Sequence, residues 1–195
     1  MAAHLINGTP ANHYQNKTLM EAIKKKRLKI KEGDIFTIPI DEQTQGYGQI
    51  VKIPNKHSFI MAVFEGRWDK NETVSLEEII KKQTLFLGFT TDALLFHGRW
   101  VIVGNIISNL SSFTMPFFKL GLPSEPQKLV NYNLDEIRLA TPEESKLLAF
   151  HSSSSPIGYQ KALQAHYGLI EYDLDQVFQY KHLVNTLAKL DLLPN

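Results

Sequence analysis

Apolar residues in the first half of the chain recur at every second position, which is the period of a strand with one buried face. After Gly33, the side chains of Phe36, Ile38 and Ile40 share one face of such a stretch, and they predict an extended strand. Pro39 lies within it. Because proline has no backbone N–H to donate, we expect this strand to lie at a sheet edge or to end at a bulge.

More strands follow in sequence. The turn Asp41–Gly46 leads into a predicted strand at Tyr47–Ile53, and the nearly all-apolar stretch His57–Phe64 has the composition of a strand covered on both faces. Three strands in succession predict an antiparallel meander. Later strands are predicted at Thr84–Thr90, Arg99–Val103, Leu129–Tyr132 and Ile137–Leu139.

The last third of the chain carries helix-capping residues. Thr141–Glu144 combines a capping threonine, a first-turn proline and two carboxylates, and it predicts a helix to about Phe150. After the serine linker Ser152–Ser155, Pro156 opens a second helix that Gly168 closes.

Three further helices are predicted from caps and spacing. Asp173 begins the last helix of the chain, whose apolar positions have helical spacing. Capping boxes at Ser75–Glu78 and at Thr18 with Glu21 predict two short helices, which end near Lys82 and Arg27. The apolar stripe of the last helix consists of Leu174, Val177, Phe178, Leu183, Val184, Leu187 and Leu190.

Strands come first and helices afterwards, without the strand–helix alternation of a parallel sheet. This order predicts an α+β fold, with a strongly bent antiparallel sheet or small barrel packed against C-terminal helices. We expect a single domain over residues 1–195: an arm and short N-terminal helix at 1–28, mainly antiparallel β-structure at 29–140, and helices at 141–195. The expected core residues are Phe36, Ile38, Val51, Ile53, Phe59 to Phe64, Trp100 and Ile102.

The composition indicates a soluble protein of a reducing compartment. The chain has no cysteine, which excludes a disulfide framework and every cysteine-based zinc site. Its opening apolar run breaks after Ile6, too early for a signal peptide. The longest apolar runs, near Phe59–Phe64 and Trp100–Ile107, fall short of the ~20 residues of a membrane helix. We therefore expect a cytoplasmic protein.

Charge is distributed unevenly along the chain. Residues Lys17–Lys31 hold seven basic residues against Glu21 alone, whereas the chain from Glu32 onward has 14 basic and 19 acidic residues, a balance of −5. A basic arm before a small barrel can hold phosphates, so a nucleic-acid-binding protein that uses Lys24–Arg27 is the alternative function. The arm lacks the interleaved aromatic residues that stack on bases, which favours a solvated helix end.

No arrangement of chemically active side chains stands out. The seven histidines form no HxH or HxxxH pair, and Gly46-Tyr-Gly48 lacks a phosphate-binding glycine frame. His151 beside Ser152–Ser155 lacks a nucleophile elbow and is interpreted as linker and cap. Carboxylate pairs such as Glu77/Glu78 stand at turns or helix starts, where capping explains them. We predict no catalytic residue, no cofactor and no metal ligand, and hence a binding protein and not an enzyme.

Large aromatic and charged residues in predicted turns are the candidate contacts for such a partner. Arginine and aromatic side chains contribute a disproportionate share of interface energy. The sequence places Tyr47, Arg67, Trp68 and Asp69 in or beside the turns at 41–46 and 66–74. Capping of the core edge is the structural alternative for Trp68.

Three strand motifs, taken in order, resemble a known family. They are Lys31-Glu-Gly-Asp-Ile-Phe-Thr-Ile-Pro-Ile40, then Gly46-Tyr-Gly-Gln-Ile-Val51, then Gly98-Arg-Trp-Val-Ile-Val-Gly104. This succession resembles the immunity protein 26 family of bacterial polymorphic and contact-dependent toxin systems. The resemblance spans about Lys29 to Glu144 and includes Leu139-Ala-Thr-Pro-Glu-Glu144.

The resemblance implies a function as well as a class. It implies an immunity protein that binds and neutralises a cognate toxin domain in a stoichiometric complex, with the toxin as protein partner and without a small-molecule substrate. The family supplies no catalytic residue to transfer. The basic arm before Lys29 and the helical segment after Phe150 lie outside the resemblance.

Overall fold

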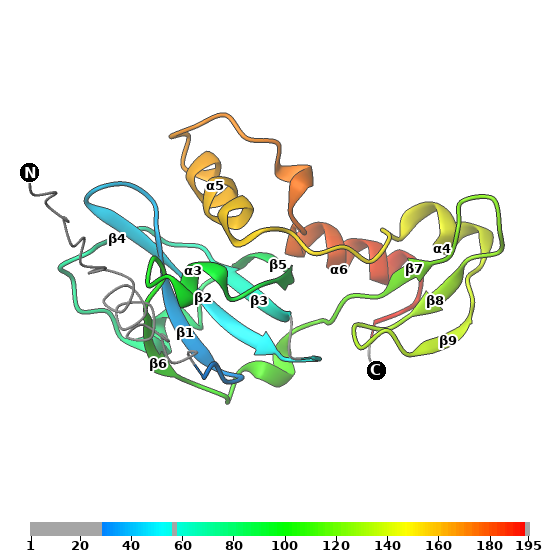
Figure 1. Ribbon diagram of the computed structural model, residues 1–195, viewed down its shortest axis with the longest axis horizontal. Helices are drawn as coiled ribbons and strands as arrows, with labels where there is room; N and C mark the ends of the chain where they lie inside the picture. The colour runs from blue at the N-terminus through cyan, green and yellow to red at the C-terminus, as the bar shows by residue number, and fades with distance from the viewer. Residues whose placement is uncertain (1–28, 56–57, 194–195) are drawn as a thin grey trace, which may run out of the picture.

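The computed structural model of the protein describes residues 29–55 and 58–193. In this part the strands form a six-stranded sheet and a three-stranded sheet, both antiparallel, at opposite ends of the long axis (Figure 1). The elements in chain order are β1 (Asp34–Pro39), β2 (Thr44–Lys52), β3 (Phe59–Phe64), β4 (Trp68–Asp69), α2 (Leu76–Ile79), β5 (Thr84–Thr90), α3 (Ala93–Phe96), β6 (Ile102–Asn105), the 3₁₀ turn η1 (Leu110–Ser112), β7 (Phe118–Leu120), β8 (Lys128–Val130), β9 (Glu136–Leu139), α4 (Pro142–Leu147), α5 (Pro156–His166), the 3₁₀ turn η2 (Leu174–Gln176) and α6 (Tyr180–Lys189).

The larger sheet contains the predicted meander. Its strand order is β5-β3-β2-β1-β6, and β4 pairs with β2 beside this path. β1 pairs with β2 and β2 with β3, each antiparallel. All six residues of β3 are buried, as its apolar composition indicated. The α+β class and the antiparallel pairing are therefore confirmed.

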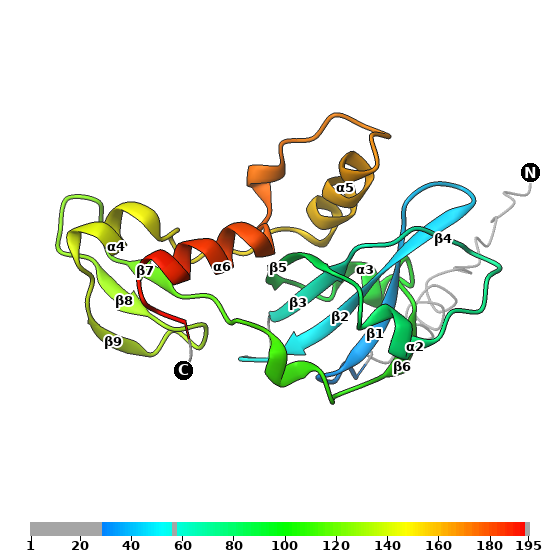
Figure 2. The same ribbon diagram turned by 180° about the vertical axis from the view of Figure 1, so that it is seen from behind.

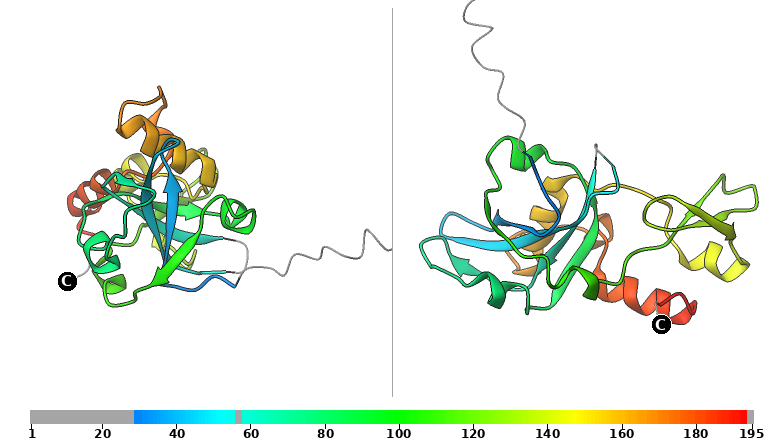
Figure 3. Two further views of the ribbon diagram at one scale, coloured as in Figure 1. Left: turned by 90° about the vertical axis from the view of Figure 1, so that its left-hand side faces the viewer. Right: turned by 90° about the horizontal axis from the view of Figure 1, so that it is seen from below.

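The larger sheet is open, which corrects the prediction of a small barrel or a strongly bent sheet (Figure 3). A barrel requires the two edge strands, β5 and β6, to pair. Instead, the free edge of β5 takes up the segment before α6: Phe178 O accepts a hydrogen bond from Leu87 N over 3.0 Å, and Phe86 bridges to Gln179. This segment covers the edge that barrel closure would have needed.

Pro39 ends β1 inside the sheet, where the sequence predicted an edge strand. β1 lies between β2 and β6, so the edge prediction is wrong, and a register shift lies between Ile35 and Phe36. Thr37 N donates to Val101 O on the β6 side, over 2.9 Å. Because backbone N–H groups alternate in direction along a strand, the nitrogen of residue 39 points to the β6 side as that of Thr37 does. At this position β6 has already ended. The missing N–H of Pro39 therefore removes no hydrogen bond from the ladder.

Two glycines of β2 allow close packing on the sheet. A Cβ at Gly48 would lie 2.6 Å from the ring of Phe36, and a Cβ at Gly46 would lie 2.6 Å from Leu163 of α5. A glycine inside a strand destabilises the strand, because it has no side chain to pack. It often marks a place where another group approaches the backbone closely. The G-x-G pattern of this strand therefore serves packing of the core.

Both faces of the larger sheet are covered. On one face, α3, α5 and Trp100 pack over a cluster that contains Phe36, and the rings of Phe36 and Trp100 stack with centroids 5.1 Å apart. On the other face, α2, α6 and the segment after β6 cover a second cluster (Figure 2). The predicted core residues are buried, except that Ile53 and Ile102 are half-buried.

The smaller sheet is joined to α4 by an ion pair. Thr141 N donates to Glu144 Oε2 over 2.7 Å and Glu144 N donates to Thr141 Oγ1 over 3.2 Å, which confirms the predicted cap as a full capping box. Arg138 of β9 donates two hydrogen bonds to the same carboxylate, at 2.7 and 2.6 Å. The side chain of Glu144 is 3% exposed and that of Arg138 is 45% exposed. One buried carboxylate thus connects strand and helix.

The end of α4 and the start of β6 differ from their predicted positions because of hydrogen bonds to other segments. α4 ends at Leu147 and not near Phe150, because Ala149 O accepts a hydrogen bond from Lys119 N of β7. β6 begins at Ile102 and not at Arg99, because Arg99 N and the next backbone N–H donate to Leu94 O of α3. β7 itself was not predicted.

Two predicted helix starts are also corrected. Asp173 accepts a hydrogen bond from Asp175 N and caps only η2, whereas α6 begins at Tyr180, because the segment between them runs extended along β5. Ser75 donates to Glu77 Oε2 and makes no capping bond, and α2 ends at Ile79. The helix predicted after Thr18 lies outside the described residues.

Candidate partner-contact site

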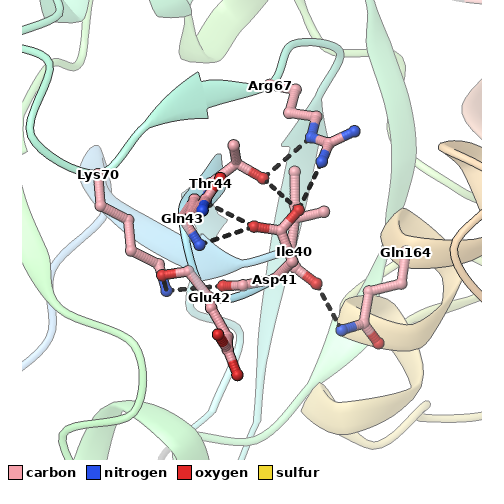
Figure 4. Close-up of polar contacts among 8 residues, drawn as sticks. All are labelled: Ile40, Asp41, Glu42, Gln43, Thr44, Arg67, Lys70 and Gln164. Atoms are coloured by element: carbon pink, nitrogen blue, oxygen red, sulfur yellow. Dashed lines mark hydrogen bonds and ion pairs between the residues drawn. The ribbon is translucent and has the colours of Figure 1, made fainter.

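Two loops meet at one end of the larger sheet. One is the turn between β1 and β2, and the other follows β3 and contains β4. They are joined by the β2–β4 pairing, in which Thr44 lies opposite Asp69 and Gln45 opposite Trp68. We call the surface formed by residues 41–45 and 65–72 the turn platform (Figure 4).

The carboxylate of Asp41 organises the turn between β1 and β2. Its Oδ1 accepts hydrogen bonds from Gln43 N (2.8 Å) and Thr44 N (2.7 Å). Its Oδ2 accepts from Thr44 Oγ1 (2.8 Å) and Arg67 Nη2 (2.5 Å). These bonds, those from Thr44 above all, hold the pKa of Asp41 well below its usual range. The carboxylate is therefore charged at neutral pH and fully engaged inside the turn.

Both cations of the second loop hold the first loop in place. Arg67 Nε donates to Thr44 Oγ1 over 2.9 Å. Lys70 Nζ donates to the carbonyl oxygens of Asp41 (2.7 Å) and Glu42 (2.9 Å), as Figure 4 shows. The charge of Arg67 is thus paired with Asp41, whereas the ammonium of Lys70 is held by neutral carbonyl oxygens and keeps its charge.

Helix α5 supports the platform from a distant part of the chain. Gln164 Nε2 donates to Ile40 O over 2.7 Å, at the start of the turn. Gly66 N donates to the hydroxyl of Tyr167 over 2.8 Å, and burial raises the pKa of this phenol. Strand, loop and helix therefore hold the platform in one conformation before any partner arrives.

Trp68 lies between the platform surface and the core. Gly66 has φ +138°, and a Cβ there would lie 2.0 Å from the Trp68 ring, so only glycine fits beneath the indole. The Trp68 ring meets that of Tyr47 edge to face, with centroids 5.0 Å apart. Tyr47 is 5% exposed, whereas Trp68 is half-buried.

The charge of the platform is acidic on balance. Glu42, Glu65, Asp69 and Glu72 are exposed, and none of them forms an ion pair with another described residue. The carboxylate of Asp69 accepts a local hydrogen bond from Asn71 N over 2.8 Å. The platform contains five acidic residues against two basic ones, so its exposed carboxylates give it a negative balance beside a half-buried indole.

The structure brings the four predicted contact residues together. Arg67, Trp68 and Asp69 lie in the platform, and Tyr47 lies beneath it, against Trp68. The prediction did not include Asp41, although its spacing from Thr44 is typical of a side chain that hydrogen-bonds the backbone of a turn. It also missed Lys70 and Gln164. No local pattern could have found Gln164, which lies 124 positions from its acceptor.

The motifs that carried the family resemblance meet in a structural joint. Asp34 Oδ2 accepts from Lys31 N (2.7 Å) and Asp34 Oδ1 accepts from Asn105 Nδ2 (2.8 Å), so a buried carboxylate links the first motif to the residue directly after the third. Gly33, at φ +89°, lies against the backbone of Ile106. These contacts connect β1 to the segment at β6, and the turn platform is a separate surface.

The described residues also bear on metal binding and membrane insertion. Within 29–55 and 58–193, no group of three or more histidine, aspartate or glutamate side chains is placed to hold a metal ion. No helix of the described segments is long and apolar enough to cross a membrane. The basic run Lys24–Arg27, on which the nucleic-acid alternative rests, lies outside the described residues.

Comparison with known proteins identifies the class. Residues 31–129 match the model of immunity protein 26, about half of the chain. The protein therefore belongs to the immunity protein 26 family, as the strand motifs indicated. The segment Leu139–Glu144, which the resemblance included, lies beyond the matched residues. Neither the curated proteins nor the solved structures yielded a match.

Membership of an immunity family has a general functional meaning. Immunity proteins neutralise toxins, and they are typically inhibitors and not enzymes. Membership of the family therefore implies a cognate toxin as the partner of this protein.

Proposed function

We propose that this protein neutralises a cognate bacterial toxin domain by forming a stoichiometric complex with it in the cytoplasm of the producing cell. The observation that carries the proposal is the match of residues 31–129 to immunity protein 26. A stoichiometric inhibitor needs a rigid complementary surface and no catalytic group. The chain contains no cysteine, which suits a reducing compartment.

We further propose the turn platform as the toxin-contact surface, with Arg67, Trp68 and Asp69 as contact residues and Tyr47 supporting them from below. Two features support this assignment. The Asp41 hydrogen bonds and the bond from Gln164 hold the loops in one conformation, so binding loses little conformational entropy there. A half-buried tryptophan next to a packed ring is typical of interface hot spots.

The charge of the platform favours a basic toxin surface. Its exposed carboxylates have no ion-pair partner among the described residues, and complementary charges accelerate the encounter of two proteins. A toxin that acts on nucleic acid and binds phosphates through a basic cleft is one kind of protein with such a surface.

Co-expression tests the proposed function. The C-terminal domain encoded by the gene immediately upstream is expressed with and without this protein, and the purified pair is examined by light scattering coupled to size-exclusion chromatography. We expect growth only in the presence of this protein, and a complex with one copy of each chain. Equal toxicity in both cultures together with no complex at micromolar concentration would contradict the proposal.

Charge reversal tests the proposed surface separately. Glu42→Lys combined with Asp69→Lys is expected to weaken toxin binding about tenfold or more, mainly through slower association. Glu125→Lys is the control, because this exposed glutamate lies in the turn between β7 and β8, at the other end of the molecule. If the wild type binds and the double variant binds equally well, the platform assignment is wrong and the immunity function stands.

A further inference from the structure

The imidazole of His151 lies at the junction between the two sheets. Its ring meets Phe89 of β5 edge to face, with centroids 4.7 Å apart, and Phe118 of β7 in the same way at 5.1 Å. The two phenylalanine rings are 5.9 Å apart, and Phe178 packs on Phe118 at 5.7 Å. One imidazole is therefore the common neighbour of a strand from each sheet.

The segment around His151 ties the two sheets together. On one side of it, Lys119 N donates to Ala149 O over 3.0 Å, and Lys119 of β7 bridges to Phe150 in a parallel pairing. On the other side, Ser154 N donates to Phe89 O over 3.0 Å. A displacement of His151 would act on both attachments.

The buried nitrogen of this ring has no acceptor. Nε2 is inaccessible to solvent and has no hydrogen-bond partner among the described residues. The protonated imidazole carries an N–H on both nitrogens, so it would place a charged donor at Nε2 in an aromatic environment, which costs free energy unless an acceptor is supplied. Burial lowers the pKa of His151, and no neighbouring charge contributes to the shift.

The titratable groups on the packed elements are engaged elsewhere or exposed. β5 carries none. Lys119 of β7 donates its Nζ to Ser145 O and lies 4.7 Å from the ring centroid of Phe150. On the chain that leads to Phe178 and α6, Asp175 and His182 are exposed. None of these groups hydrogen-bonds to His151, so burial decides its charge.

We propose that His151 makes the junction between the sheets acid-sensitive: on protonation its ring leaves the space between Phe89 and Phe118, and the three-stranded sheet separates from the larger sheet. The neutral ring fills the junction, whereas the charged ring is more stable in water. This behaviour does not depend on the proposed toxin binding.

Hydrogen exchange of the isolated protein measures the separation. We expect peptides covering β7, β8 and β9 to lose protection between about pH 7.5 and about pH 5.5, after correction for intrinsic exchange, while β1 to β3 stay protected. Because opening takes up one proton, its equilibrium constant should rise about tenfold per pH unit below the ordinary imidazole pKa, until the lowered pKa is reached.

Two variants distinguish His151 from a general acid effect. His151→Phe keeps an aromatic ring at the junction and cannot titrate, so its small sheet should show no added loss of protection in acid. His97→Gln, at an exposed position after α3, should behave as the wild type. An acid response in His151→Phe equal to that of the wild type would overturn the proposal.

A measurement on the wild type keeps the proposal testable if the variant does not fold. The titration of the His151 imidazole is followed by nuclear magnetic resonance in the same pH range. We expect its midpoint to coincide with the loss of protection in β7 to β9. A ring that becomes protonated while the small sheet remains protected would contradict the proposal.

Discussion

Neutralising Glu144 should destabilise the protein at neutral pH and remove part of its acid sensitivity. The change Glu144→Gln keeps the volume of the side chain and leaves one oxygen to accept from Thr141 N. It removes the negative charge that pairs with both terminal nitrogens of Arg138. Since the glutamate side chain is only 3% exposed, water cannot replace these bonds on that side.

The structure sets the size of the effect. Hydrogen bonds from Arg138, followed by those from Thr141, lower the pKa of Glu144 from 4.5 to about 2. A shift of this size corresponds to at most about 3 kcal/mol at pH 7. Because Arg138 is 45% exposed, solvent screens part of the attraction, and we expect a loss of about 2 kcal/mol.

The sign of the pH dependence follows from the same shift. In the unfolded chain Glu144 titrates at its ordinary pKa of 4.5, and in the folded protein at about 2. Its stabilising contribution is therefore complete above pH 4.5 and is lost as the pH falls from 4.5 toward 2. The difference in unfolding free energy between wild type and Glu144→Gln should shrink over that window.

Urea titrations at neutral and acid pH measure this difference, with Glu143→Gln as the matched control. Glu143 is the exposed neighbour in the same helical turn, and its change should alter stability by less than about 0.5 kcal/mol. A Glu144→Gln protein as stable as the wild type at pH 7 would refute the argument. So would a difference that does not change between neutral and acid pH.

Two other predictions concern the last helix and the basic arm. Leu187→Ala should lower the unfolding free energy by about 2 to 5 kcal/mol, because Leu187 is fully buried in a core cluster that contains residues of both sheets, whereas Leu169→Ala, at a 42% exposed position, should cost less than about 0.5 kcal/mol in the same denaturant titration. A small loss for Leu187→Ala would place α6 on the surface. For Lys24–Arg27, we expect the wild type to show no salt-dependent binding of single-stranded nucleic acid; a steep salt slope that flattens when these four residues are neutralised would favour the nucleic-acid alternative.

Elements defined by neighbouring residues could be predicted from the sequence. The alternation around Phe36 and the apolar run of β3 placed strands correctly, because burial of one or both faces imposes a period on nearby positions. The caps at Thr141 and Gly168 are likewise local: the threonine bonds its own first turn, and Gly168 takes φ +70° just beyond α5. These features depend on residues that are close in the sequence, which is why the sequence alone predicts them.

The candidate site could be predicted only in part. Arg67, Trp68 and Asp69 were predicted as contact residues because binding residues are often carried by exposed turns. The sequence did not reveal that Arg67 is engaged by Asp41, which leaves it bound within the turn. The sequence also did not show that Tyr47 is buried under the indole and differs in this from the other three predicted contact residues. The alternation of buried and exposed positions along β2 is interrupted by two glycines that serve packing.

The sequence by itself determined the α+β class, the strands of the meander, the caps of α4 and α5, and membership of the immunity protein 26 family. Only the tertiary structure decided that the larger sheet is open, that α5 supports the turn platform and that His151 lies between two sheets. The physical reason is the range of the contacts. Periodicity and capping act over a few residues, whereas the edge of β5 is covered by a segment about ninety positions further along the chain. A contact of that range depends on how the packed layers meet, which no local pattern encodes.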